Sequence, residues 1–313
     1  MAQNAVATVA KKPKKEKRSQ FSGMSKALVR RETISAYLFL LPSLIFFIGF
    51  VVIPMIMCVV FSLQEMGLDS SATKFIGFAN YVKMAQDPIF WKGFLNTVII
   101  VVVAVPAVTA FSLWVSSAIY QMKAVTRSFF RCVFYLPVVT GTVAVTVVWK
   151  WMFNPYNGLL NQIFGTTGYD WLGNSATAIW CIILILFTTS IGQPIVLYVA
   201  ALGNVDQSLV EAAQVDGATK LQVFWKIKWP QIMPTTLYIL VITTINSFQC
   251  FALIQLLTSG GPNHATDTIM YYIFQMAYNN QNFGYANAMG VVLAIIIAIF
   301  SAIQFKFAKT DNG

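Results

Sequence analysis

The stretch Glu211-Ala212-Ala213-Gln214-Val215-Asp216-Gly217, which continues to Pro234, is a polar segment set between two long apolar ones. It carries charges of both signs, whereas residues 178–202 and 235–257 on either side carry none. Charged side chains are expensive to bury without partners, so this segment has to lie in water. It predicts a compact loop at one face of a membrane bundle, where a partner protein could exert force.

Two short helices are predicted inside this loop. Ser208 and Glu211 have the spacing of a capping box, in which Ser208 would cap a helix that ends near Asp216. Gly217 suits the end of that helix because glycine adopts positive φ without steric strain. A plain cap and turn explains these residues as well as a docking surface does, and both interpretations stay open at this point.

The second helix is expected from Thr219 to Ile227. Pro230 and Pro234 follow it and are expected to interrupt the chain before it enters the membrane again. Spacings of i, i+3 and i+4 predict one apolar face on this helix, made by Leu221, Phe224 and Trp225.

The whole chain is too apolar for a soluble protein. Of its 313 residues, 57% are hydrophobic and only 10% are charged, whereas soluble domains carry about 25% charged residues. Six segments reach the roughly 20 apolar residues that a spanning helix needs, and lipid-exposed backbone has to bond within its own helix. We therefore expect an all-α membrane protein with six transmembrane helices, at Ala36–Leu63, Phe94–Tyr120, Cys132–Trp151, Ala178–Leu202, Thr235–Leu257 and Tyr285–Phe305.

Positive charge is unevenly distributed between the two sides of these spans. Lys and Arg concentrate in the N-terminal tail and after the second, fourth and sixth spans, which predicts that both termini are cytoplasmic. The tail fits an orientation signal better than a binding site for anionic lipid, and nothing suggests nucleic acid as a partner. The expected organisation is a basic cytoplasmic tail (1–33), a first transmembrane helix (34–63), an external loop (64–93), and a core (94–308) that contains the cytoplasmic loop at about 203–234.

Motifs that carry catalysis are missing from the sequence. It has no phosphate loop, no nucleophile elbow and no zinc-binding His-Glu-x-x-His. The single histidine, His264, and four scattered cysteines offer no metal cluster, and Cys58, Cys132, Cys181 and Cys250 are expected to be small buried apolar residues. No charged residue falls at the centre of a predicted span and no Arg lies in one, so the acidic relay of many proton-coupled carriers is absent. We expect neither an enzyme nor a bound cofactor, and uphill transport would need energy from another subunit.

Hydrogen-bonding side chains line one face of each of two predicted spans. A polar solute that crosses the membrane needs such groups, although the same residue types also join membrane helices to each other. Phe248 could stack on a sugar ring or pack against lipid. The residues predicted to line a substrate path are Thr243, Asn246, Ser247, Cys250 and the adjacent Gln249 on the fifth span, and Thr189, Ser190 and Gln193 on the fourth.

The polar loop resembles the signature loop of membrane subunits of ABC importers. That signature is Glu-Ala-Ala, three residues, Gly, nine residues, Ile, one residue and Leu-Pro, and it is matched here by Glu211-Ala212-Ala213, Gly217, Ile227 and Trp229-Pro230. Trp229 stands where the family usually has Leu, so packing at that position is expected to differ. The resemblance implies that Glu211, Ala212, Ala213, Asp216 and Gly217 belong to a coupling helix that docks on an ATPase.

Residues 34–308 further resemble the sugar-importing, maltose-type branch of this family. The segments that carry the likeness are Phe153–Gly158, Asn246–Phe251, Leu257–Pro262 and Phe283–Ala286. The resemblance implies a type I importer permease fold in a bacterial-type inner membrane. It also implies a heterodimer with a second permease, two ATPase subunits that bind ATP and Mg, and an external sugar-binding protein.

Three alternatives remain open for the function. Within the importer class, the solute could be a polyol, a sugar phosphate or glycerol phosphate instead of a carbohydrate, although the absence of Arg from the spans disfavours a phosphorylated ligand. A stand-alone secondary carrier is disfavoured by the missing ion relay and by the partner-type loop. A membrane enzyme is weaker still, because no catalytic constellation is present.

Overall fold

The computed structural model of the chain describes residues 26–68 and 73–310, and most of the basic tail lies outside them. The chain divides into two compact units, residues 1–57 and 58–313. The first unit is helical from α1 (Lys26–Phe47) through the π-helical turn η1 (Ile48–Val52), and α2 (Ile53–Ser62) continues into the second unit. The most apolar part of this long helix contains no buried residue, as expected of a helix that faces lipid.

The second unit is a helical bundle with a small hairpin. A two-stranded antiparallel ladder, β1 (Gln64–Glu65) with β2 (Lys74–Phe75), precedes the bundle. Its remaining elements are α3 (Ala79–Gln86), α4 (Pro88–Ile119), α5 (Ala124–Val139), α6 (Thr142–Met152), α7 (Leu159–Phe164), α8 (Ala178–Ser190), α9 (Gly192–Gly203), α10 (Gln207–Val215), α11 (Lys220–Val223), η3 (Phe224–Lys228), α12 (Trp229–Phe248), α13 (Ala252–Leu257), α14 (Ile269–Phe274), η4 (Gln275–Asn279) and α15 (Phe283–Thr310).

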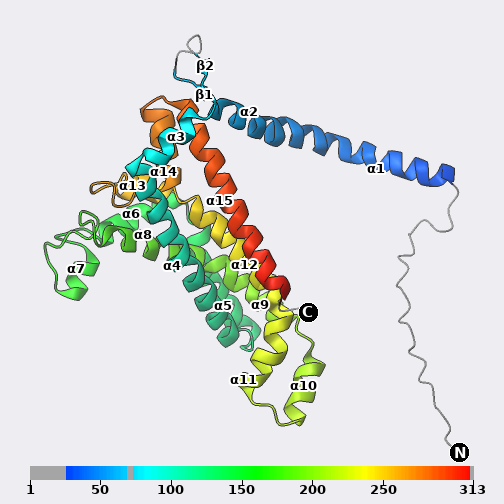
Figure 1. Cartoon of the computed structure of the whole chain (residues 1–313). Helices are drawn as coiled ribbons and strands as arrows, with labels where there is room; N and C mark the ends of the chain where they lie inside the picture. Colours follow the sequence, from blue (N-terminus) through cyan, green and yellow to red (C-terminus); the bar gives the residue numbers. More distant parts are fainter. Residues whose placement is uncertain (1–25, 69–72, 311–313) are drawn as a thin grey trace, which may run out of the picture. The chain divides into compact units, whose positions relative to one another are not determined.

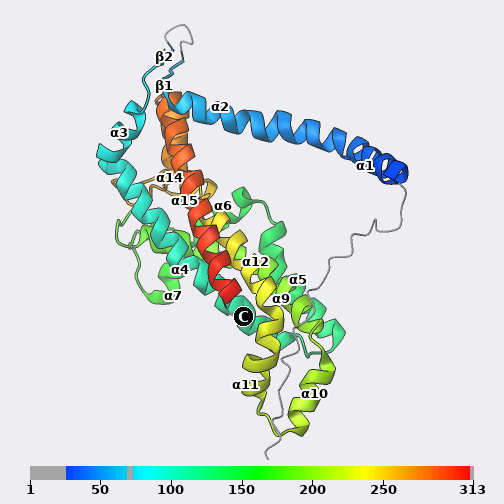
Figure 2. The same ribbon diagram turned by 45° about the vertical axis from the view of Figure 1, so that its right-hand side comes forward.

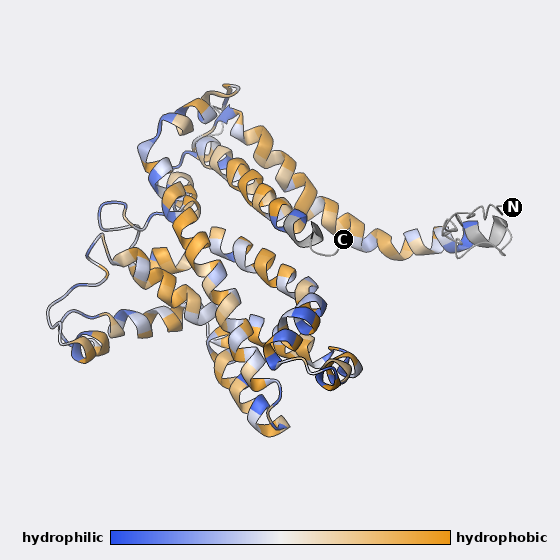
Figure 3. Ribbon diagram, turned by 60° about the horizontal axis from the view of Figure 1, so that its bottom comes forward, coloured by the Kyte–Doolittle hydropathy of each residue, from blue (hydrophilic) through white to orange (hydrophobic). Residues whose placement is uncertain are grey.

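The long helix α4 forms the centre of this bundle. It packs against α8, α9 and α12, and α12 in turn packs against α15. Figures 1 and 2 both place α10 and α11 at the end of the bundle opposite α3 and the hairpin. Apolar residues run along the long helices, while polar residues gather at helix ends and in connecting segments (Figure 3).

Three helices of the described chain are long and apolar enough to cross a membrane, or five if each of two bent pairs counts as one span. The three are Arg30–Ser62, Pro88–Ile119 and Phe283–Lys306, which agree with the first, second and sixth predicted spans. The bent pairs are α5 with α6, at 95°, and α8 with α9, at 41°. The helix α12 is not among these candidates, and its apolar run is flanked by Pro, Gln, Thr, Asn and Ser.

Two predicted spans are wrong in their outlines. The third, Cys132–Trp151, is not a single helix, because the helix that starts at Ala124 ends at Val139 and turns sharply at Thr140-Gly141. The fifth, Thr235–Leu257, ends at Phe248, and residues 249–251 separate it from α13. Apolarity predicted continuous helices because it does not show where a chain is buried in protein or lines a cavity, and irregular backbone is tolerated in a membrane only in such places.

Asp87 holds one end of the bundle together. It caps α4 by accepting hydrogen bonds from the amides of Ile89 and Phe90, at 2.9 and 3.4 Å. Its other carboxylate oxygen accepts from the hydroxyls of Tyr272 of α14 and Tyr285 of α15, at 2.6 and 2.8 Å. Partial burial raises the pKa of Asp87, but these four hydrogen bonds outweigh it and hold the pKa below its ordinary value.

Replacing Asp87 by Ala is expected to lower the free energy of unfolding by about 1–2 kcal/mol, because it removes a helix cap and leaves two tyrosine hydroxyls without their acceptor. The carboxylate's contribution should be fully present above its unfolded pKa of about 3.9 and be lost as pH falls through the lower folded value. Thermal unfolding of the detergent-solubilised protein across pH measures both effects. The exposed Asp216→Asn is the control, and equal stability of both variants at neutral pH would contradict the assignment.

Candidate functional site

The first loop helix, α10, is capped by Asp206 and not by Ser208 as predicted. The Asp206 carboxylate accepts hydrogen bonds from the Ser208 amide at 2.9 Å and from its hydroxyl at 2.7 Å, which hold the pKa of Asp206 below its ordinary value. The predicted capping box between Ser208 and Glu211 is therefore wrong. Asp206, two residues before Ser208, provides a charged and stronger acceptor for the first amides of the helix. Glu211 is left exposed.

The end of α10 agrees with the prediction. Gly217 has φ +81°, and its amide bonds the Gln214 carbonyl while the Ala218 amide bonds the Ala213 carbonyl at 2.9 Å. This is a Schellman motif, which needs a left-handed residue after the helix. Of the residues expected in a coupling helix, Glu211, Ala212, Asp216 and Gly217 are exposed, and Ala213 is half-buried.

The second loop helix does not stop at the prolines. A capping box between Thr219 and Gln222 starts α11, and the π-helical turn η3 joins it to α12 without a break. Pro230 directly follows the π turn and Pro234 lies farther along α12, and the helix continues through both. The expected interruption is therefore wrong, and one helical rod runs from the loop into the bundle.

This loop exposes large apolar side chains. Leu221 and Trp225, two of the three residues on the predicted apolar face, are 69% and 53% exposed, and the third, Phe224, is half-buried. On α10, Leu209 and Val215 are also exposed. A soluble loop rarely leaves several such residues in water unless a partner covers them.

The α11–η3–α12 rod is attached to α4 at the start of the bundle. The Lys228 ammonium donates a hydrogen bond to the Tyr120 hydroxyl, at the end of α4, and lies 4.7 Å from the centre of that ring. The Gln231 side chain accepts from the Asp206 amide at 3.1 Å. The loop is thus in contact with both α4 and α12.

Two adjoining pockets lie where the bent and interrupted helices meet. The α6–α13 pocket, of about 270 Å³, is lined by Thr140, Thr142, Thr189, Gln249 and Cys250 among apolar neighbours. The α9–α12 pocket, of about 140 Å³, is lined by Thr189, Ser190, Gln193, Thr243 and Asn246. Val138 and Thr189 line both pockets, so the two adjoin, and we call them together the hollow.

The structure brings together seven of the eight residues predicted for a substrate path. The exception is Ser247, which lines neither pocket and is 2% exposed. Phe248 is fully buried against Phe300, with ring centres 5.3 Å apart, so it packs inside the protein and faces neither a sugar nor lipid, the two predicted alternatives. Thr140 and Thr142 were missed, although Pro137 and the Thr-Gly-Thr sequence inside an apolar segment signal a helix break there.

The bend between α8 and α9 is stabilised by neighbouring helices. Ser112 and Ser116 of α4 donate hydrogen bonds to the carbonyls of Ile191 and Ile195, at 3.3 and 3.1 Å. Opposite them, α5 approaches so closely that a Cβ on Gly192 would lie 2.4 Å from the Phe134 carbonyl oxygen. Glycine is thus required at the bend, because any side chain there would collide with the α5 backbone.

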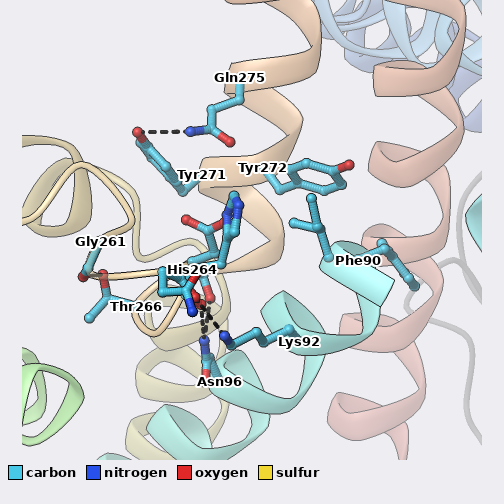
Figure 4. Close-up of polar contacts among 12 residues, drawn as sticks. Phe90, Lys92, Asn96, Gly261, His264, Thr266, Tyr271, Tyr272 and Gln275 are labelled. Carbon is cyan, nitrogen blue, oxygen red and sulfur yellow. Dashed lines mark hydrogen bonds and ion pairs between the residues drawn. The ribbon is translucent and has the colours of Figure 1, made fainter. Parts of the chain in front are cut away.

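The interruption after α12 is tied to the loop that follows α13. Thr268 donates a hydrogen bond to the Cys250 carbonyl at 2.9 Å, and the amide of Asn96 on α4 donates to the Asp267 carbonyl at 2.9 Å. Figure 4 shows Lys92 and Asn96 reaching from α4 to this loop beside His264. Burial raises the pKa of the Asp267 carboxyl above its ordinary value. The hydrogen bond with His264 lowers this pKa, but by less than burial raises it.

Metal-binding chemistry is not evident in the described residues, among which no group of three or more His, Cys, Asp or Glu lies together. All four cysteines are free. Cys181 and Cys250 are buried as predicted, but Cys132 is exposed, because it faces outward from α5.

Residues 84–309 match the family of binding-protein-dependent transport system inner membrane components. The chain belongs to this family. The probable ABC transporter permease protein YurN of Bacillus subtilis is 34% identical over 91% of this chain and 99% of its own length. The diacetylchitobiose uptake system permease protein NgcF of Streptomyces coelicolor is 32% identical over 85% of this chain and 80% of its own. The sn-glycerol-3-phosphate transport system permease protein UgpA of Escherichia coli is 27% identical over 88% and 94%.

Solved structures confirm the fold of this ABC importer permease. A bacterial alginate ABC transporter, in complex with an alginate pentasaccharide-bound periplasmic protein, matches with a TM-score of 0.75 and 24% identity over 89% of this chain and 94% of that one. The MetNI methionine ABC transporter matches with a TM-score of 0.54 and 18% identity over 72% of this chain. The importer permease fold expected from the signature loop is thereby confirmed.

Gly192→Ala is expected to destabilise the permease by about 1–3 kcal/mol, because α5 and α9 have to separate to admit the methyl group. Thermal unfolding in detergent measures the loss. The matched control is Gly203→Ala at the end of α9, where a Cβ meets nothing within 4 Å and helix propensity favours alanine. If the two variants unfold alike, the close approach at Gly192 does not hold in the protein.

Proposed function

We propose that the chain is the transmembrane subunit of an ATP-driven importer and passes a carbohydrate from an external binding protein into the cytoplasm. The observation that carries the proposal is the continuous helical rod from Lys220 to Phe248. One end of this rod exposes the apolar residues Leu221 and Trp225, and the other end presents Thr243 and Asn246 to the polar hollow. An ATPase that moves the loop would thereby change the hollow directly.

The topology we propose has six spans with both termini in the cytoplasm. Three single helices and the two bent pairs provide five, and α12 provides the sixth because it packs between α4 and α15. The uneven distribution of Lys and Arg supports this orientation. It puts the α10–α11 loop in the cytoplasm and the loop after α13 outside.

The partners we propose are a second, homologous permease, two ATPase subunits that bind ATP and Mg, and an extracytoplasmic sugar-binding protein. Support comes from relatives: NgcF is named for diacetylchitobiose uptake, and the alginate transporter is recorded with a periplasmic protein that carries a pentasaccharide. The lining of the hollow fits a polar, uncharged solute, because it offers hydroxyl and amide groups and no charged side chain.

The second candidate solute is a polyol or glycerol phosphate. UgpA is named for glycerol-3-phosphate transport, and one Arg lies directly before the predicted third span. Arg131 lies inside α5, because that helix begins at Ala124 and not at Cys132. No Arg lies within the predicted third span itself, Cys132–Trp151. A stand-alone secondary carrier is the alternative from another class.

Substitutions in the hollow are expected to change uptake. Asn246→Ala and Gln193→Ala each remove one hydrogen-bonding group from the lining and should raise the KM for the transported sugar by about tenfold. Uptake of radiolabelled sugars by proteoliposomes that contain the whole importer measures this. Ser247→Ala, adjacent in sequence but outside the lining, is the control. Unchanged KM and rate in both lining variants would remove these residues from the path.

Substitutions in the loop are expected to impair coupling. Glu211→Ala and Gly217→Pro should lower transport-coupled ATP hydrolysis at normal expression, the second because proline cannot adopt positive φ. Leu221→Ser should weaken co-purification of the ATPase, whereas Lys226→Ser on the polar side should not. Full uptake by the chain alone, without ATP, would contradict the importer function and support a secondary carrier.

A further inference from the structure

A third depression, which we call the α5–α9 groove, adjoins the hollow. It has a volume of about 470 Å³ and opens to the outside of the bundle. It shares Gln193 and Leu197 with the α9–α12 pocket. Its walls are mainly apolar, with Cys132 and the Tyr135 ring from α5 and Val196 and Leu197 from α9. Such a wall suits a hydrocarbon chain better than a sugar.

Arg131 projects a positive charge into this groove. It is half-buried, and it donates a hydrogen bond to the Ser128 hydroxyl at 3.3 Å. Among the described residues Arg131 enters no ion pair. Four of the five donors of a guanidinium thus remain available in a partly desolvated place.

No neighbouring helix offers Arg131 a counter-ion. The sequence has no Asp or Glu between Asp87 and Asp170, a stretch that contains five basic residues. The helices that pack against α5 are α8 and α9, and neither carries any charge. A partly buried cation without an acidic partner favours an anion from outside the chain.

We propose that the α5–α9 groove binds an anionic phospholipid. The headgroup phosphate accepts hydrogen bonds from Arg131, with the Ser128 and Tyr135 hydroxyls at the same rim. One acyl chain lies along Cys132, Val196 and Leu197. The occupant is a lipid because the groove combines an apolar wall with one unpaired cation, which is the complement of an anionic amphiphile. This inference does not depend on which solute the permease carries.

The test is native mass spectrometry of the assembled importer, taken from nanodiscs that contain phosphatidylglycerol and phosphatidylcholine in equal amounts. The wild-type complex should retain phosphatidylglycerol. Arg131→Gln should lower the retained fraction by about tenfold, because it removes charge-assisted hydrogen bonds. Val196→Trp, which fills the groove without a change of charge, should lower it as well. Lys150→Gln carries the same change of charge away from the groove and should retain the lipid.

Three outcomes would overturn the proposal. The first is retention of phosphatidylglycerol by both Arg131→Gln and Val196→Trp. The second is equal retention of the two lipids by the wild type. The third is loss of bound lipid when glycerol phosphate is added, together with a changed KM for anionic solutes in Arg131→Gln, which would assign the groove to the solute. Because bound lipid is measured without transport, a failed import assay leaves this test intact.

Discussion

The satisfaction of backbone hydrogen bonds in an apolar surrounding governs this structure. A membrane helix that bends or stops leaves carbonyl and amide groups that lipid cannot satisfy. The chain has such breaks at Thr140-Gly141, at Ile191 and at residues 249–251. Each break faces the same hollow, and side chains satisfy backbone groups there: Ser112 bonds the Ile191 carbonyl and Thr268 bonds the Cys250 carbonyl. The polar hollow and the broken helices therefore depend on each other. The hollow keeps the broken backbone away from lipid, and the breaks bring polar groups to the hollow.

The same constraint connects the hollow to the loop. Between Lys220 and Phe248 the helix does not break, and the turn η3 absorbs the change of pitch instead. Such π turns are rare in proteins, and many of those that occur lie at functional sites. The contact of Lys228 with Tyr120 fastens the rod to α4 where it enters the bundle. In the function we propose, motion of the loop moves the side of the hollow that carries Asn246, which lies on the same rod.

Sequence patterns predicted the class, the long helices and most of the polar lining, because apolar length and helical spacing are local properties. They missed the outlines of the third and fifth spans, since hydropathy does not register where a helix breaks beside a cavity. The cap at Asp206 was missed because two acceptors, Asp206 and Ser208, compete within three residues and only geometry decides between them. Ser247 and Asn246 share one helical face in the sequence, but the packing of α12 buries the first and exposes the second. Arg131 falls one residue before the predicted third span and yet inside α5, because hydropathy marks the apolar part of a helix and not the residue at which the helix begins.

Water access to the three breaks is the most direct test of the claim that they line a polar path through the membrane. Single cysteines at positions 140, 189, 246 and 249, and at 247 as the buried reference, would be placed in an importer without other cysteines. A charged, membrane-impermeant thiol reagent would then be applied from both sides, with and without ATP. We expect the first four positions to react at rates that ATP changes, and position 247 to stay unreactive. Uniform protection of the four, or equal reaction at position 247, would contradict it.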